Sequence, residues 1–153
     1  MNKSLIPGID YIGITTPFYC TDGKGRLLLH KRSNTCRDEQ GRWDAGGGQL
    51  EFGETPEQGV LREVKEEYNC DGEILEQIPP ISIFRKQNGI DTHWLALPFI
   101  VKVDPLQVKN NEPSKIEQLR WFTLDNLPSP LHSALEKDII KTERFEYIKK
   151  YIR

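Results

Sequence analysis

The segment from residue 46 to residue 69 constrains the fold of this chain most, because it carries the marks of one short amphipathic helix. Thr55 followed by Pro56 is typical of a helix start, where the hydroxyl caps backbone N–H groups and proline takes the first helical position. Gln58 can complete a capping box with Thr55. Asn69 tolerates the left-handed conformation that ends many helices. The sequence therefore predicts a helix of about thirteen residues from Pro56 to a stop at Asn69.

Two neighbouring faces of this helix differ in character. At about 100° per residue, its apolar side chains share one arc, which is expected to pack on a sheet: Val60, Leu61, Val64 and Tyr68. The adjacent arc carries acidic side chains: Glu63, Glu66 and Glu67. Each close acidic pair costs on the order of 0.2–0.5 kcal/mol, and the negative helix end adds about 0.3–1 kcal/mol per carboxylate. Arg62 offsets only a few tenths of a kcal/mol of this repulsion.

This acidic face needs a partner that neutralises it. Clustered carboxylate oxygens are the ligands that Mg²⁺ or Mn²⁺ selects, and magnesium is usually shared between carboxylates, water and substrate phosphates. The residues Gly46, Gly47 and Gly48 stand just before the helix and would let the backbone approach a ligand closely. The alternatives are a solvated acidic face and a simple glycine turn. The glutamates and the glycines together favour a metal site.

Runs rich in β-branched and aromatic residues predict strands on both sides of this segment. They cover residues 11–20, 26–33, 78–86, 92–103 and 116–124. The first two runs flank the sequence TDGKG, which predicts a hairpin. Because no repeat or change of composition interrupts the chain, we expect a single mixed α/β domain over residues 1–153.

The end of the chain predicts a second helical region. Apolar residues recur at helical spacing from Pro130 onward, and the pattern is interrupted near Thr142. Before it, residues 104–115 are polar and rich in Asn and Pro, so we expect a loop there.

Charge and cysteine content exclude several classes of partner. The formal net charge of −2, with 21 basic and 23 acidic residues, gives no broad positive field for binding long nucleic acid. Three widely spaced cysteines do not suggest a disulfide framework and are consistent with reduced thiols. No apolar run is long enough for a membrane span or a secretory signal. We therefore expect a cytoplasmic protein with neither a membrane nor a long nucleic acid as partner.

The spacing of polar residues in the central segment is specific. From Gly48 the chain reads glycine, five residues, Glu54, seven residues, and then REVKEE at residues 62–67. This pattern, continued to Cys70, resembles the Nudix box, the signature of the Nudix hydrolases. The chain departs from it in having Gly46 where proline commonly stands and Asn69 in place of glycine. Neither departure removes a metal ligand.

The resemblance implies a Nudix-like α/β/α sandwich with a mixed β-sheet. It further implies that Mg²⁺, or Mn²⁺ in its place, is held by Glu63, Glu66 and Glu67, with the carbonyl of Gly48 as a further ligand. Glu54, Arg62 and Glu63 are the implied catalytic residues, and Glu54 and Arg62 also connect the loop to the helix. The group that accepts the proton of the attacking water stays open between the following carboxylates: Glu54, Glu63, Glu112 and Glu117.

Family members cleave a nucleoside diphosphate linked to another group. We therefore predict a Mg²⁺-dependent pyrophosphohydrolase that converts a nucleoside or deoxynucleoside triphosphate to the monophosphate and pyrophosphate. The alternatives are a nucleoside diphosphate sugar or ADP-ribose hydrolase and a nucleotide-sensing module without catalysis. Arg32 and Arg85 lie on strands expected to frame the site and are the candidate substrate-binding residues, although either can be a surface charge. A homodimer is compatible with this interpretation.

Overall fold

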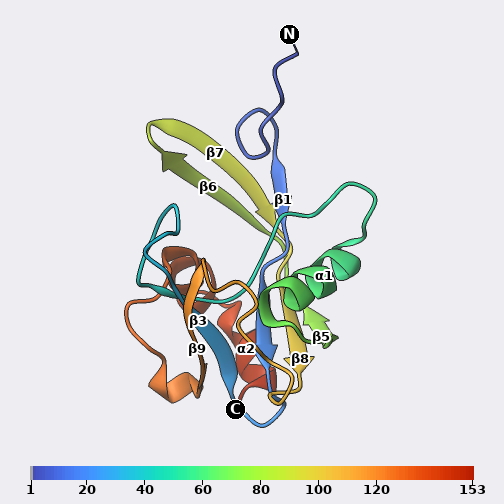
Figure 1. Cartoon of the computed structure of the whole chain (residues 1–153), viewed down its shortest axis with the longest axis vertical. Coiled ribbons are helices and arrows are strands. Elements are labelled where there is room, and N and C mark those ends of the chain that lie inside the picture. Colours follow the sequence, from blue (N-terminus) through green and yellow to red (C-terminus); the bar gives the residue numbers. More distant parts are fainter. Residues whose placement is uncertain (1) are drawn as a thin grey trace.

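Helices cover both faces of a central β-sheet in the computed structural model, which describes residues 2–153 (Figure 1). Strand β2 (Phe18–Thr21) is buried along its whole length. Its Phe18 and Cys20 pack with helix α1 (Pro56–Tyr68), whereas Tyr19 packs on the opposite face with the π-helix Leu135–Ile140 and with helix α2 (Phe145–Tyr151). This arrangement is the predicted α/β/α sandwich.

The central sheet is mixed, as predicted. Its strand order is β4-β3-β2-β8-β5, and β9 pairs with β3. The bounds of these strands are β3 Leu27–Arg32, β4 Trp43–Asp44, β5 Gly72–Gln77, β8 Phe99–Val103 and β9 Ile116–Phe122. Strands β2 and β3 form the expected antiparallel hairpin, while β2 and β8 run parallel. A short 3-10 helix, Leu124–Asn126, follows β9.

A smaller sheet has the order β1-β7-β6. Its strands are β1 Gly13–Thr15, β6 Ile81–Gln87 and β7 Ile90–Ala96. The turn between β6 and β7 places Asn88 and Gly89 at φ 50° and 77°, which these residue types tolerate. The β6–β7 hairpin extends from the body of the molecule beside the N-terminal segment (Figure 1).

The prediction of one strand over residues 92–103 is wrong. Residues 97 and 98 interrupt it, and the two halves, β7 and β8, belong to different sheets. The run 11–20 breaks in the same way before Pro17, since β1 ends at Thr15 and β2 begins at Phe18. Proline has no N–H to donate to a sheet, and a proline lies at each of the two breaks. Pro17 lies between β1 and β2, and Pro98 lies between β7 and β8, so the chain passes from the smaller sheet to the central sheet at both residues. Strand β5 was not predicted.

Helix α1 has the predicted ends. The hydroxyl of Thr55 accepts a hydrogen bond from Gln58 N at 3.2 Å, and Gln58 Oε1 accepts one from Thr55 N at 2.9 Å. Asn69 ends the helix in the left-handed conformation with φ 55°. The C-terminal helical region is divided near Thr142, also as predicted.

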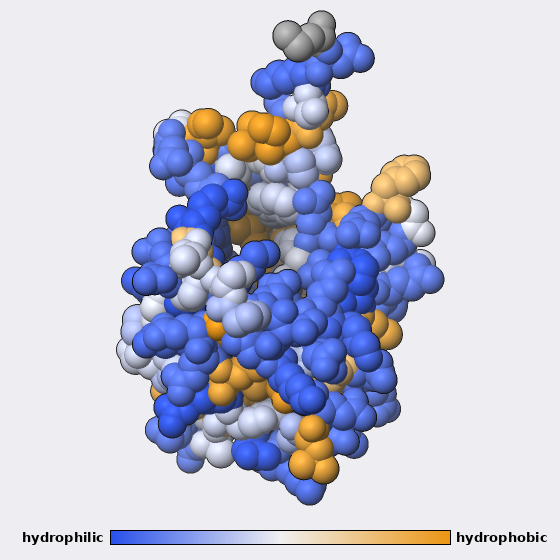
Figure 2. Space-filling model, in the orientation of Figure 1, coloured by the Kyte–Doolittle hydropathy of each residue, from blue (hydrophilic) through white to orange (hydrophobic). Residues whose placement is uncertain are grey.

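Apolar side chains gather on the surface at the end of the molecule formed by the hairpin and the N-terminal segment (Figure 2). The large exposed residues of these segments are Leu5, Ile6, Ile9, Tyr11, Ile12, Phe84 and Ile90. The homodimer stays a prediction. No helix within residues 2–153 is long and apolar enough to cross a membrane.

Candidate active site

The acidic face of helix α1 borders a cavity of ≈ 580 Å³. Glu63, Glu66 and Glu67 all line this cavity, as the helical spacing predicts. The glycines at positions 47 and 48 form part of the same wall. Basic residues from other segments complete the lining: Arg32, Arg37 and Lys115. The cavity therefore combines oxygen ligands with groups that bind phosphate.

Arg62 joins the loop before α1 to the helix. Its Nε and Nη2 donate to the two carboxylate oxygens of Glu54 at 3.0 and 2.7 Å, and Nη2 also donates to Gln49 O at 3.1 Å. Its Nη1 donates to Glu63 Oε1 at 2.7 Å. The hydrogen bonds from Arg62 hold the pKa of Glu54 below its usual value. Arg62 thus fixes the position of two of the three residues for which catalytic roles are expected.

Gly48 lies against the carboxylate of Glu63. A Cβ atom at this position would overlap that carboxylate, so no larger residue fits without moving Glu63. The carbonyl oxygen of Gly48 accepts hydrogen bonds from Thr16 N at 2.9 Å and from Thr15 Oγ1 at 3.0 Å. The glycine loop therefore brings a fixed carbonyl close to the acidic face of the helix.

Glu67 is buried, and its Oε2 has no hydrogen-bond partner. Burial raises the pKa of Glu67 well above its usual range, and the nearby charges of Glu63 and Glu112 raise this pKa further. A buried carboxylate oxygen without a partner is unfavourable, and a bound cation would satisfy it. The residues present at this site therefore fit a divalent metal ion.

The three glutamates do not form a ready coordination sphere. Across residues 2–153, no three His, Cys, Asp or Glu side chains converge closely enough to hold a metal ion as they stand. Glu63 is turned toward Arg62, while half of the Glu66 side chain is exposed to solvent. The carboxylates would have to reorient around a cation.

The loop 104–115 adds a further carboxylate to the cavity. Lys109 N donates to Tyr68 O at 2.9 Å, and Asn111 N donates to Glu67 O at 3.1 Å, so the loop satisfies free carbonyls at the end of α1. This attachment brings Glu112 to the cavity wall. Glu117 does not line the cavity and instead lies 3.7 Å from Lys31 Nζ.

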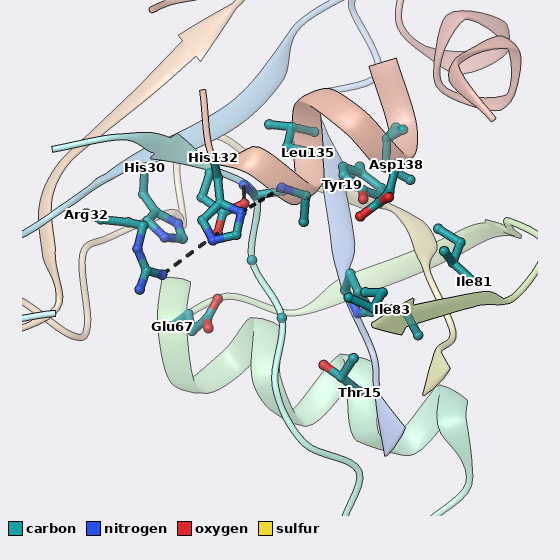
Figure 3. A pocket seen from close by; sticks show the side chains of 18 residues that line it. Thr15, Tyr19, His30, Arg32, Glu67, Ile81, Ile83, His132, Leu135 and Asp138 are labelled. Carbon is teal, nitrogen blue, oxygen red and sulfur yellow. Dashed lines mark hydrogen bonds and ion pairs between the residues drawn. The ribbon is translucent and has the colours of Figure 1, made fainter. Parts of the chain in front are cut away.

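A second cavity, of ≈ 260 Å³, adjoins the first (Figure 3). The two cavities share four lining residues, namely His30, Arg32, Gly47 and Glu67. The second cavity continues to the other face of the sheet, where it is bordered by β6 and the π-helix. Sequence reasoning did not select His132 and Asp138, which line this cavity, because only the tertiary fold brings them near the glycine loop.

The polar wall of the second cavity is held by a network of ion pairs and hydrogen bonds. Arg32 Nη2 donates to Asp38 Oδ1 at 2.8 Å, while its Nη1 lies 3.8 Å from Asp44 Oδ2. His132 Nε2 lies 2.7 Å from Glu39 Oε2. Burial lowers the pKa of His30 to about 4, with smaller contributions from Arg32 and His132.

The candidate substrate-binding arginines lie in different places. Arg32 borders both cavities. Arg85 borders neither of them, and its Nη1 lies 3.7 Å from Glu39 Oε2. Two large aromatic residues also lie outside these cavities: Trp43 packs on Phe122 in the core, and Phe84 is exposed.

Comparisons with known proteins agree with this geometry. The family model of the NUDIX domain matches residues 13–142. A MutT NUDIX hydrolase from Burkholderia pseudomallei has a similar structure, with a TM-score of 0.71 and 30% identity, covering 81% of this chain and 92% of that one.

Two relatives are named for action on RNA. An RNA pyrophosphohydrolase from Gluconacetobacter diazotrophicus is 24% identical over 138 residues, which are 79% of this chain and 82% of that protein. An NAD-capped RNA hydrolase NudC from Stutzerimonas stutzeri is 33% identical over 119 residues, which are 77% of this chain but only 40% of that protein. The chain therefore belongs to the Nudix hydrolases, a family that acts on nucleotide substrates and generally uses divalent metal ions.

Proposed function

We propose that this protein is a Mg²⁺-dependent pyrophosphohydrolase that converts a nucleoside triphosphate, with a canonical, deoxy or oxidised nucleoside, to the monophosphate and pyrophosphate. The observation that carries the proposal is the buried, unpartnered carboxylate oxygen of Glu67, which opens with Glu63 and Glu66 onto a cavity that also contains basic side chains. A single catalytic domain over residues 1–153 is part of this proposal.

Glu63, Glu66 and Glu67 would hold the cation, with the carbonyl of Gly48 beside them. Such a cation neutralises phosphate charge and lowers the pKa of a bound water. Arg37 and Lys115 lie on the wall of the same cavity and would bind phosphate oxygens.

We assign the proton acceptor to Glu112. It lines the cavity, and its nearest basic partner in the described residues, Lys115, lies 4.0 Å away. Both carboxylate oxygens of Glu54, by contrast, accept hydrogen bonds from Arg62, which lowers the basicity of that group. Glu54 therefore serves to position Arg62 and the loop before α1.

The test is a product assay on a panel of nucleoside triphosphates with Mg²⁺. We expect pyrophosphate and the nucleoside monophosphate from the wild type, and a loss of turnover by orders of magnitude in Glu66→Gln and Glu67→Gln. Glu57→Gln is the matched control, because Glu57 is exposed in the first turn of the same helix. Near-normal turnover in both test variants would contradict the metal assignment.

The products also separate the alternatives. A sugar phosphate released from a nucleoside diphosphate sugar or from ADP-ribose, without cleavage of triphosphates, would favour a hydrolase of those substrates. Nucleotide binding with no cleavage across the panel would favour a sensing module.

A further inference from the structure

We propose that the smaller cavity is a base-recognition chamber in which Asp138 accepts the N1–H and 2-amino hydrogen bonds of a guanine-type base. The inference rests on the proposed function in one respect, which is that the ligand is a nucleotide whose phosphates lie among the glutamates of α1. It adds the identity of the base and the residue that reads it.

The chamber has apolar walls of the kind that can cover a flat ring system. Ile81 and Ile83 of β6 line one side, and Leu135 of the π-helix lines the other (Figure 3). Ile139 of the same helix also lines the chamber. These aliphatic side chains would cover the faces of a planar base and exclude water from its edge.

The chamber is continuous with the cavity that holds the glutamates. Gly47 and Glu67 belong to the walls of both. The strip Ala45-Gly46-Gly47 between them carries no side chain larger than a methyl group. A nucleotide can therefore place its phosphates on one side of this strip and its base on the other.

Most polar groups of the chamber already have partners. Asp44 Oδ1 accepts a hydrogen bond from Ala45 N at 2.8 Å. His30 Nδ1 lies 3.0 Å from Tyr68 Oη. His132 Nδ1 accepts from Ala134 N at 3.2 Å, and its Nε2 lies 2.7 Å from Glu39.

Asp138 differs from these groups. Within residues 2–153, no basic side chain forms an ion pair with the Asp138 carboxylate at 4.0 Å or less. It is half-buried on the π-helix, near Tyr19 at the apolar end of the chamber (Figure 3). Short π-helical segments are frequent at functional sites. A half-buried carboxylate that lines a cavity and has no ion partner is suited to a ligand that donates hydrogen bonds.

Guanine matches a carboxylate better than the other bases do. Its N1–H and 2-amino group point the same way and can meet both carboxylate oxygens, an arrangement that is stronger than a single neutral hydrogen bond. Adenine, cytosine and uracil each place a ring nitrogen or carbonyl acceptor beside their donor, and that acceptor would repel the carboxylate. An oxidised guanine keeps the favourable edge.

The test is direct binding of nucleoside monophosphates to the full chain with Mg²⁺, measured by calorimetry. We expect guanosine monophosphate to bind at least about tenfold more tightly than inosine monophosphate, which lacks only the 2-amino group. Asp138→Asn should lower affinity for guanosine monophosphate by about tenfold or more and affinity for inosine monophosphate by less. Glu136→Gln is the control, because Glu136 lies on the same helix, pairs with Lys141 at 3.1 Å and does not line the chamber.

Equal affinities of the wild type for the two monophosphates would overturn the inference, and this comparison needs no variant. An unchanged preference in folded Asp138→Asn would overturn the role of that residue. Binding of a monophosphate requires no hydrolysis. If the protein distinguishes guanosine monophosphate from inosine monophosphate but cleaves no triphosphate, only the proposed function is contradicted. Cleavage of triphosphates without discrimination would contradict the chamber alone.

Discussion

Arg62 and Glu54 form a two-point ion pair, with Nε–Oε2 and Nη2–Oε1 distances of 3.0 and 2.7 Å. Lysine keeps the charge but cannot reproduce the planar pair of donors. We expect Arg62→Lys to lower kcat/KM by about 10- to 100-fold, because Glu63 and the loop lose their fixed positions. Steady-state kinetics will check this, with Lys65→Arg as a control on the same helix. Unchanged kinetics would show that the pair has no positioning role.

Gly48 is expected to be intolerant of even a methyl group. In Gly48→Ala the new Cβ would overlap the Glu63 carboxylate and displace it. We expect turnover to fall by about a hundredfold while the fold is retained, since small displacements at a reacting centre have effects of that size. Gly47→Ala is the comparison, because the nearest atoms that its Cβ would meet belong to the backbone of Thr16 and Pro17, with Pro17 Cα at 3.1 Å, and not to a glutamate. Equal losses in both variants would contradict the prediction.

Glu112 should affect the chemical step more than substrate binding. We expect Glu112→Gln to lower kcat by about 10²- to 10⁴-fold, as for loss of a general base, with little change in KM. Glu117→Gln provides the control, since Glu117 pairs with Lys31 outside the cavity. If the two variants behave alike, proton acceptance belongs to another group.

Glu67 links metal binding to stability. Because its buried Oε2 has no partner, we expect Glu67→Gln to raise the unfolding temperature in EDTA by several degrees, equivalent to about 1–2 kcal/mol. The wild type should gain stability when Mg²⁺ is added, and the variant should gain much less. Thermal unfolding with and without Mg²⁺ measures both effects. A destabilised variant in EDTA would indicate that the carboxylate has a structural partner.

The low pKa of His30 predicts that the folded protein loses stability in acid. Its pKa of about 4 in the folded protein lies below the unfolded value of about 6.5, so the unfolded chain binds the proton more readily. Between pH 7.5 and pH 5 this difference should remove about 2 kcal/mol from the free energy of unfolding, and the loss should level off below pH 4. Urea unfolding across this range, compared with His30→Gln, isolates the contribution. Parallel pH curves for the two proteins would rule it out.

Local chemistry made helix α1 and the shared orientation of its glutamates predictable. The caps at Thr55 and Asn69 and the spacing of the glutamates depend on neighbours only a few residues away, and the structure reproduces them. The contact between Gly48 and Glu63 lies within this same segment.

Features that depend on distant parts of the chain were not predictable. The break at Pro98 depends on pairing with strands that are distant in the sequence, because β7 pairs with β1 in one sheet and β8 pairs with β2 in the other. The π-helix and its Asp138 gain their place from packing against Tyr19 and β6 rather than from a local signal. A loop attached to the end of α1 likewise decides that Glu112, and not Glu117, reaches the glutamates.

The two faces of the central sheet carry different parts of the site, since α1 covers one face and the π-helix covers the other. Sequence changes on the π-helix can therefore accumulate without disturbing the glutamates across the sheet. A protein built in this way can evolve a new nucleotide preference while it keeps its hydrolytic machinery unchanged.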